Sequence, residues 1–134
     1  VALKQGDVLV VFRIRPENYK GFGTAYYKYS MRGAMDIATL VFADAARLDG
    51  DNFAELRLAF RVAAPTPVRC ETAEKAALGQ SLSEETLKVI RNAVAKDVNP
   101  RNSWRATKEF RLHIIRTLTQ RVVRQAAERA GGKF

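Results

Sequence analysis

The segment from Tyr26 to Arg32 gathers residue types that can contact a planar cofactor. It reads Tyr-Tyr-Lys-Tyr-Ser-Met-Arg and closely follows a glycine-containing turn. Aromatic rings lie against flat cofactors or nucleic-acid bases, and a lysine donates to a phosphate or to an anionic ring oxygen. The same composition also suits an ordinary β-strand with a face of tyrosines. Residue types alone leave both interpretations open and favour the ordinary strand.

Elsewhere the residue types give little support to catalysis. His113 is the only histidine and Cys70 the only cysteine, which excludes an internal disulfide and metal sites built on several histidines or thiolates. The residues therefore suggest no nucleophile–base pair. Gly21 and Gly23 lack the third glycine of a dinucleotide-binding loop, so we expect an ordinary turn there. We predict no catalytic residue and no metal ligand in this chain.

Two arginines are candidates for structural contacts. Asp36 lies four residues after Arg32 and could pair with it across a predicted loop, a type of contact that is structural more often than catalytic. Arg111, near the start of the last predicted helix, could reach a carboxylate or a carbonyl between the layers. We expect both contacts to support the architecture.

Basic residues outnumber acidic ones, with 23 Lys and Arg against 14 Asp and Glu, for a formal net charge of +9. The excess gathers in residues 105–133, where eight basic residues stand against two acidic ones. Such a surface attracts nucleic acid, an acidic protein or phosphate, which makes a basic interaction module one hypothesis. Since no nucleic-acid-binding motif accompanies the charge, a solvated helix face is the simpler interpretation, and we predict no nucleic-acid partner.

The length of 134 residues suits a single domain with a buried core, with a strand half over residues 7–64 and a helical half over 70–130. No run of 18 or more apolar residues is present, so we predict no membrane span and no membrane partner. A single cysteine and the lack of a signal-peptide pattern fit a reducing cytoplasm. Because the chain opens on Val1, directly before a strand-like run, we expect it to be part of something longer.

The first half of the chain has the signals of strands, namely alternation over residues 8–14 and 53–64, aromatic residues over 24–30 and an almost continuous apolar run over 37–48 that its period alone does not settle. We predict strands over residues 8–14, 24–30, 37–48 and 53–64. The apolar side of the first consists of Val8, Val10, Phe12 and Ile14, and that of the last of Leu56, Leu58, Phe60 and Val62. Asp49-Gly50 lies between the last two runs and indicates an antiparallel hairpin with a loop longer than two residues.

The second half has helical spacing. We predict helices over residues 71–78, from Ser83 to the stop at Asn99-Pro100, and over 107–129. The inner stripe of the second helix is Leu87, Ile90 and Val94, and that of the third is Phe110, Ile114, Leu118, Val122 and Ala126, flanked by Ile115 and Val123. Strands followed by helices predict an α+β fold, an antiparallel sheet of three to four strands with three helices packed on one face.

Three stretches together resemble one family. Residues 23–32 with 35–38 resemble the segment that opens the C-terminal domain of flavoproteins in the molybdenum hydroxylase family, which includes xanthine, carbon monoxide and nicotinate-type dehydrogenases. Residues 64–69 resemble the family's strand-to-helix junction, and residues 103–111 resemble the start of its final helix. The stretches occur in order over nearly the whole chain, and their sequences are most similar to those of the FAD-binding subunits of bacterial xanthine dehydrogenases.

The resemblance implies a division of labour among subunits. A molybdopterin subunit oxidises the purine, an iron–sulfur subunit relays the electrons, and the flavin subunit passes them to NAD. This chain would be the last part of that flavin subunit, and the upstream FAD-binding portion, with its pyrophosphate loops, is absent from this sequence. The implied cofactor is therefore a shared FAD, with molybdopterin and iron–sulfur clusters held by partner subunits, and the isolated chain is expected to be inactive.

The resemblance also suggests contact residues for the flavin. Tyr26 matches a family aromatic that lies near the isoalloxazine, and Lys28 matches a lysine that approaches the flavin ring from this domain. Tyr29 and Arg32 belong to a loop that borders the flavin in relatives that use NAD. The resemblance therefore implies cofactor binding by these four residues and favours the cofactor interpretation of this segment over the ordinary strand.

Overall fold

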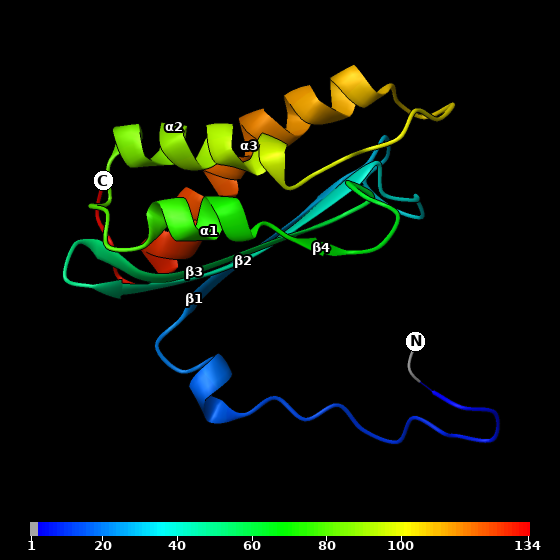
Figure 1. Ribbon diagram of the computed structural model, residues 1–134, viewed down its shortest axis with the longest axis horizontal. Helices are drawn as coiled ribbons and strands as arrows, with labels where there is room; N and C mark the ends of the chain where they lie inside the picture. The colour runs from blue at the N-terminus through cyan, green and yellow to red at the C-terminus, as the bar shows by residue number, and fades with distance from the viewer. Residues whose placement is uncertain (1–2) are drawn as a thin grey trace.

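Residues 3–134 are described by a computed structural model in which a sheet precedes three helices (Figure 1). The strands are β1 (Gly23–Tyr29), β2 (Leu40–Asp49), β3 (Asn52–Arg61) and the short β4 (Val68–Arg69). The helices are α1 (Glu71–Ala77), α2 (Glu84–Ala93) and α3 (Lys108–Arg129), with short 3-10 turns at Pro16–Asn18 and Val94–Lys96. Strands followed by helices give the α+β class predicted from the sequence.

The strands form one antiparallel sheet in the order β1-β2-β3-β4. β2 and β3 form the predicted hairpin, whose turn uses Gly50 at a φ of 57°, a conformation that favours glycine. The register shifts between Arg47 and Leu48, so the hairpin contains a β-bulge. The bulge explains why Phe53 and Leu56 are both buried although their spacing places them on opposite faces of a regular strand.

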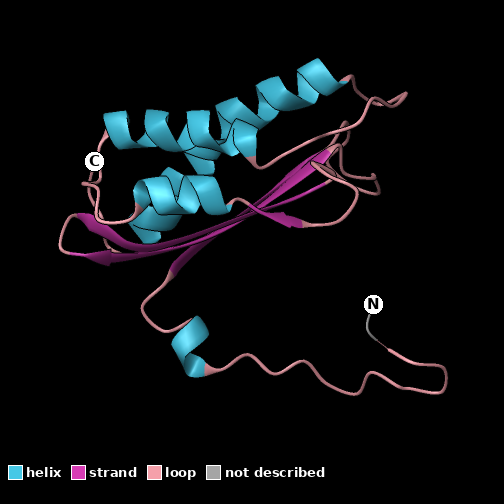
Figure 2. Ribbon diagram, viewed as in Figure 1, coloured by secondary structure: helices cyan, strands magenta, loops and turns pink. Residues whose placement is uncertain are grey.

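All three helices cover one face of the sheet, as predicted (Figure 2). α3 contacts β1 and β2, α1 contacts β3, and α2 contacts the other two helices. The core between the layers includes Phe42 and Phe60, whose rings meet edge-on with 4.9 Å between centroids. Ser83 caps α2 by accepting the backbone N–H of Thr86 at 3.2 Å. None of the described helices has both the length and the apolar character needed to cross a membrane.

The inner face of α3 differs from the predicted stripe. Its buried residues are Arg111, Ile115, Thr119, Val122, Val123, Ala126 and Ala127. Phe110, predicted as the first stripe residue, is 43% exposed. The prediction was wrong at this end because it counted only apolar residues. Arg111 and Thr119 enter the core by donating their polar hydrogens to backbone carbonyls, those of Thr39 and Ile115.

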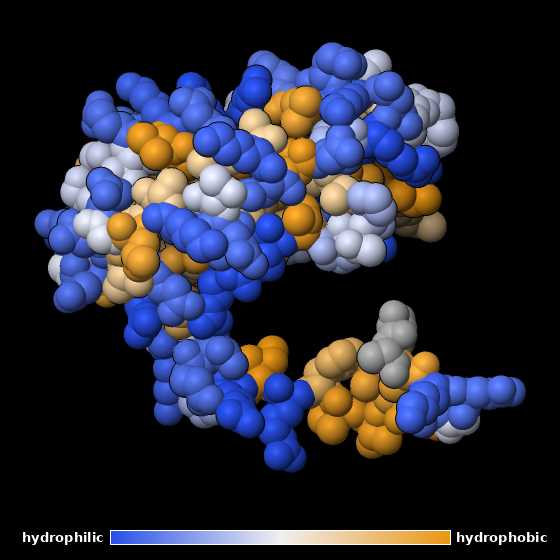
Figure 3. Space-filling view, viewed as in Figure 1, coloured by the Kyte–Doolittle hydropathy of each residue, from blue (hydrophilic) through white to orange (hydrophobic). Residues whose placement is uncertain are grey.

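The strand predicted over residues 8–14 is not formed. Residues 3–15 instead form an extended arm that leaves the body on the side of the sheet opposite the helices (Figures 1 and 3). Large apolar side chains of this arm are exposed, namely Val8, Leu9, Val10, Val11, Phe12 and Ile14. A strand requires a neighbour to pair with its backbone, and within the described residues none lies beside this segment. The prediction of a strand at residues 8–14 was therefore wrong, although the segment is rich in apolar residues.

Phe22 fixes the base of the arm against the sheet. The guanidinium groups of Arg47 and Arg57 lie over the Phe22 ring, 5.4 and 4.5 Å from its centroid. Arg57 also donates from Nη1 to the carbonyl of Asn18 at 3.1 Å. These contacts combine cation–π attraction with a hydrogen bond, so the turn before β1 is held although the arm beyond it projects.

Candidate functional site

The face of the sheet opposite the helices, here called the open face, carries two rows of side chains near one end. Tyr26 pairs with Ala43 across β1 and β2, and Ala43 pairs with Ala59 of β3. In the next row, Lys28 pairs with Val41, which pairs with Arg61. Because the neighbours of Tyr26 are alanines, this tyrosine is 64% exposed and its ring projects above a surface of small side chains.

The two rows border a pocket of about 530 Å³. Its lining comes from β1, β2, the loop between them and the end of β3, namely Tyr26, Lys28, Asp36, Ile37, Ala38, Val41, Arg61 and Val62. An aromatic ring, two cations and aliphatic walls therefore surround one space. This combination suits a flat, partly anionic organic ring.

Asp36 organises the loop beside this pocket. Its Oδ2 accepts the backbone N–H groups of Met31 at 2.8 Å and Arg32 at 3.0 Å. Arg32 folds back so that its Nη2 lies 3.8 Å from Asp36 Oδ1 and donates to the carbonyl of Met35 at 2.9 Å. The hydrogen bond from the Arg32 N–H, with help from Met31, Ile37 and the Arg32 charge, lowers the pKa of Asp36. The predicted contact between Arg32 and Asp36 is confirmed.

Lys28 is tied to the same loop. Its Nζ donates to the backbone carbonyl of Asp36 at 2.5 Å, so the ammonium group has a fixed position at the edge of the pocket. Its remaining N–H groups can still donate to a ligand, since a lysine carries three.

The four residues proposed as cofactor contacts divide between two faces. Tyr26 and Lys28 lie together in the pocket, as expected for alternate residues of one strand. Tyr29 points to the helical side, where its ring lies 6.2 Å from that of Phe110. Arg32 lies in the loop and does not line the pocket. The structure thus brings two of the four together.

Cys70 and Arg111 are ionisable residues of the core, away from the open face. The thiol of Cys70 is fully buried, and burial raises its pKa. A buried thiol of this kind is unreactive. Arg111 is only 2% exposed, and its guanidinium donates hydrogen bonds to the carbonyl of Thr39 and, at 2.9 Å, to the hydroxyl of Ser103. The prediction that Arg111 reaches a carbonyl between the layers is confirmed.

Comparison with known families decides the classification. Residues 25–126 match the family described as the CO dehydrogenase flavoprotein C-terminal domain, which is well over half of the chain. The chain belongs to this family.

Two named proteins are similar to this chain in sequence. The xanthine dehydrogenase FAD-binding subunit of Escherichia coli O157:H7 is 51% identical over 134 residues, which is 100% of this chain and 46% of that protein. The glyceraldehyde dehydrogenase medium chain of Sulfolobus acidocaldarius is 28% identical over 107 residues, 80% of this chain and 38% of that protein. The chain therefore spans less than half the length of these curated relatives.

Solved structures confirm the predicted CO dehydrogenase flavoprotein C-terminal fold. Carbon monoxide dehydrogenase from Hydrogenophaga pseudoflava superposes with a TM-score of 0.77 and 27% identity over 82% of this chain and 38% of that chain. Quinoline 2-oxidoreductase from Pseudomonas putida 86 shares the fold, with a TM-score of 0.75 and 21% identity over 81% of this chain and 38% of that chain.

The sequence resemblance to the CO dehydrogenase flavoprotein C-terminal family is thus confirmed, and the basic-module hypothesis gains no support. Arg111 is buried in the core, and Arg124 pairs with Glu84 of α2. Arg129 donates to the carbonyl of Thr24 at 2.6 Å. Several basic residues of the C-terminal helix therefore stabilise the fold of this family domain and do not form a free cationic face.

Arg61 is the pocket residue of this CO dehydrogenase flavoprotein C-terminal domain that sequence reasoning missed. It ends β3 and lies one strand beyond β2, so only the register Lys28–Val41–Arg61 brings it beside the predicted lysine. A signal was present, since Arg57, Ala59 and Arg61 alternate with the buried residues of β3. This alternation marks the exposed side of the strand, but the pairing register is needed to find its neighbours.

Proposed function

We propose that this chain is the C-terminal part of the FAD-binding subunit of a xanthine dehydrogenase-type molybdenum hydroxylase. The observation that carries the proposal is the pocket on the open face, where Tyr26 and Lys28 lie side by side. Identity of 51% between the whole of this chain and 46% of a subunit of that name supports it. The proposed role is to help enclose the flavin that passes electrons from an iron–sulfur subunit to NAD during purine hydroxylation in the cytoplasm.

The residues present fit one end of FAD. The exposed ring of Tyr26 suits the face of an isoalloxazine, and the ammonium group of Lys28 suits its electronegative edge. The sequence of this chain contains no Gly-rich loop of the kind that holds a pyrophosphate. We therefore propose that this domain covers the ring end, while the upstream FAD-binding portion of the longer subunit binds the remainder.

Bound FAD would supply the electron-transfer chemistry, and the residues of this domain position and polarise it. The Lys28 charge is fixed by Asp36 and stabilises negative charge on a neighbouring ring without moving. Tyr29 acts through the fold by anchoring the end of β1 to Phe110. Arg32 braces the loop through Asp36 and borders the side on which we propose that the nicotinamide approaches.

The partners proposed for this domain are the upstream FAD-binding portion of its subunit, an iron–sulfur subunit and a molybdopterin subunit. The exposed arm supports the first of these contacts. Its residues 8–14 form an almost continuous apolar run, as in a strand that is covered on both faces, and the relatives contain much more chain than this domain. We propose that the arm pairs with a sheet in that upstream portion, which would cover its side chains and satisfy its backbone.

The test uses the assembled enzyme with Lys28→Ala. Loss of the fixed cation should slow purine-dependent NAD reduction by about tenfold, which corresponds to about 1.4 kcal/mol. The midpoint potential of the flavin should become more negative, because the reduced ring loses its stabilising charge. Purine oxidation with an artificial acceptor that takes electrons at the molybdenum site should be unchanged.

Lys88→Ala is the matched control, since Lys88 is an exposed lysine on α2 in the opposite layer. This variant should leave both activities and the flavin potential unchanged. An equal loss of NAD reduction and artificial-acceptor activity in Lys28→Ala would overturn the proposal, and so would an unchanged flavin potential.

A further inference from the structure

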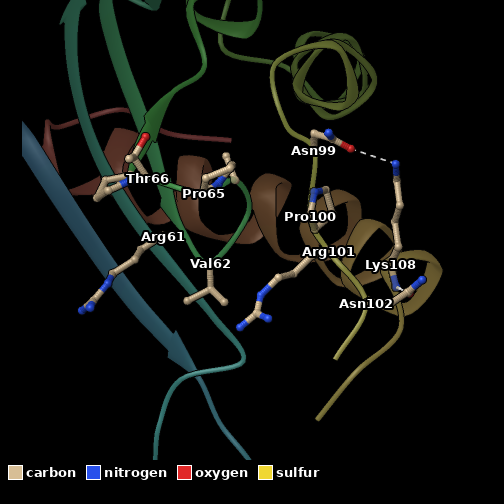
Figure 4. A pocket seen from close by; sticks show the side chains of 11 residues that line it. Arg61, Val62, Pro65, Thr66, Asn99, Pro100, Arg101, Asn102 and Lys108 are labelled. Atoms are coloured by element: carbon tan, nitrogen blue, oxygen red, sulfur yellow. Dashed lines mark hydrogen bonds between the residues drawn. The ribbon is translucent and has the colours of Figure 1, made fainter. Parts of the chain in front are cut away.

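A second pocket of about 900 Å³ lies beside the first (Figure 4). One wall is residues 61–67, which connect β3 to β4, and the other is residues 99–102, which lead from α2 towards α3. Arg61 and Val62 line both pockets and form the boundary between them. The function proposed above makes no use of this second space.

The charged side chains lining the second pocket are all basic. They are Arg61, Arg101 and Lys108, and the lining contains no carboxylate. Within residues 3–134, neither arginine takes part in an ion pair. Figure 4 shows the two arginines on either side of Val62, with the Arg101 side chain directed towards Val62, the Arg61 side chain directed away from it, and Lys108 across the pocket from Arg61. An uncompensated group of cations around one cavity attracts an anion.

The two asparagines of the lining also present hydrogen-bond donors. Lys108 donates from Nζ to Asn99 Oδ1 at 2.8 Å, and its backbone N–H donates to Asn102 Oδ1 at 2.6 Å. Each amide oxygen therefore has a donor, which leaves the amide NH₂ group of each asparagine to donate to a ligand. The side chains around the pocket thus offer guanidinium, ammonium and amide donors, the complement of an oxyanion, which only accepts.

Two further features raise the positive potential here. Lys108 is the first residue of the 22-residue helix α3, whose N-terminal end carries a partial positive charge. Burial lowers the pKa of nearby Arg111, and the charges of Arg101 and Arg105 lower it further, as expected where cations lack acidic neighbours.

The remaining walls are rigid and apolar. Pro65, Pro67 and Pro100 line the cavity, and a proline has a fixed φ. Val62 has a φ of 68°, which is strained for a β-branched residue, and its carbonyl lies 3.5 Å from Arg111 Nη1. Apolar walls of this size suit the organic part of a ligand better than a bare inorganic ion.

We infer that this second pocket binds a small organic phosphate, with the phosphate held by Arg101, attracted by the charges of Arg61 and Lys108 at the two edges of the pocket, and the organic part against the prolines. Arginine binds phosphate through paired N–H groups, which makes the Arg101 guanidinium, directed towards Val62 (Figure 4), the main contact. The inference goes beyond the proposed function, because Arg101 and Lys108 do not line the pocket of Tyr26 and Lys28.

The test is calorimetric titration of the full 134-residue chain with AMP, inorganic pyrophosphate and adenosine. AMP and pyrophosphate should bind saturably and more weakly at higher salt, whereas adenosine should not bind. Arg101→Gln should raise the dissociation constant for AMP by about tenfold. Circular dichroism shows whether each variant keeps its fold.

Arg116→Gln provides the matched control, because Arg116 is an exposed arginine of α3 outside the pocket. It should bind AMP as the unmodified chain does. Lack of saturable AMP binding would overturn the inference, as would equal binding of adenosine and AMP. Equal weakening by Arg101→Gln and Arg116→Gln would also overturn it, since net charge alone would then explain the effect. Failure of the flavin proposal would leave these results unaffected.

Discussion

Arg111 in the first turn of α3 donates a hydrogen bond from Nη1 to the backbone carbonyl of Thr39, the residue before β2. Both residues are buried, so this contact joins the helical layer to the sheet where water cannot replace it. Arg111→Met should therefore leave buried acceptors without a donor and lower the free energy of unfolding by about 1–3 kcal/mol. Urea denaturation measures the loss. Arg116→Met on the exposed side of the same helix should change stability little, and similar losses in both variants would contradict the assignment.

Gly23 offers a second test of the contact between sheet and helix. A Cβ at this position would lie 2.1 Å from the carbonyl oxygen of Ala126 and 2.2 Å from the nitrogen of Ala130. Both are backbone atoms at the C-terminal end of α3, Ala130 being the residue that caps it, so this end of α3 must move away from β1 to accept a methyl group. Gly23→Ala should destabilise the fold by about 1–3 kcal/mol, measured by thermal or urea unfolding. Gly33→Ala, where a Cβ meets no atom within 4 Å, should be nearly neutral.

Asp44 should make stability depend on pH. It is 4% exposed in β2, and neither carboxylate oxygen has a hydrogen-bond partner within the described chain. Burial, and then the negative charge of Glu74, raise the pKa of Asp44 well above its usual value. The folded chain therefore keeps a proton that the unfolded chain loses above about pH 4, so stability falls as the pH rises from there towards the folded pKa.

Asp44→Asn should remove this dependence. Its free energy of unfolding relative to the unmodified chain should increase with pH, by up to about 1.4 kcal/mol per pH unit. Urea titrations between about pH 4 and pH 8 measure the difference. Asp49→Asn, at the exposed end of the same strand, should give a curve parallel to that of the unmodified chain. Parallel curves for Asp44→Asn would show that Asp44 does not hold the extra proton.

The arm should make the isolated chain self-associate. Phe12 is 81% exposed within a run of exposed apolar residues, which is the type of surface that associates in water. Replacing Val10 and Phe12 by lysine should reduce association in light scattering and leave the free energy of unfolding unchanged, because both side chains lie outside the core. Val89→Lys, which replaces a single exposed apolar residue on α2, should leave association unchanged.

Local patterns were sufficient for most of the fold. The Asp49-Gly50 turn predicted the β2–β3 hairpin, and Ser83 predicted the start of α2. The spacing of Leu87, Ile90 and Val94 predicted the buried side of the second helix, and all three are buried. These features depend on neighbours close in sequence, which is why the sequence contains them.

Features that depend on distant partners were not predictable in the same way. The arm has the apolar, β-branched residues typical of a strand, but a strand also requires another segment to pair with. Arg111 was predicted to reach a carboxylate or a carbonyl between the layers, but the sequence could not identify the acceptor, the carbonyl of Thr39, because it lies far away along the chain. Tyr26 and Lys28 share a face by strand alternation alone, whereas the placement of Arg61 beside them needed the register of three strands.

The contacts of Phe22 with Arg47 and Arg57 have a mechanical consequence. Phe22 is the residue immediately before Gly23, the first residue of β1, the strand that presents Tyr26 and Lys28. A pull on the arm is therefore borne by the two arginines, on β2 and β3, before it reaches β1. The arm can therefore move without changing the spacing between the Tyr26 ring and the Lys28 ammonium group.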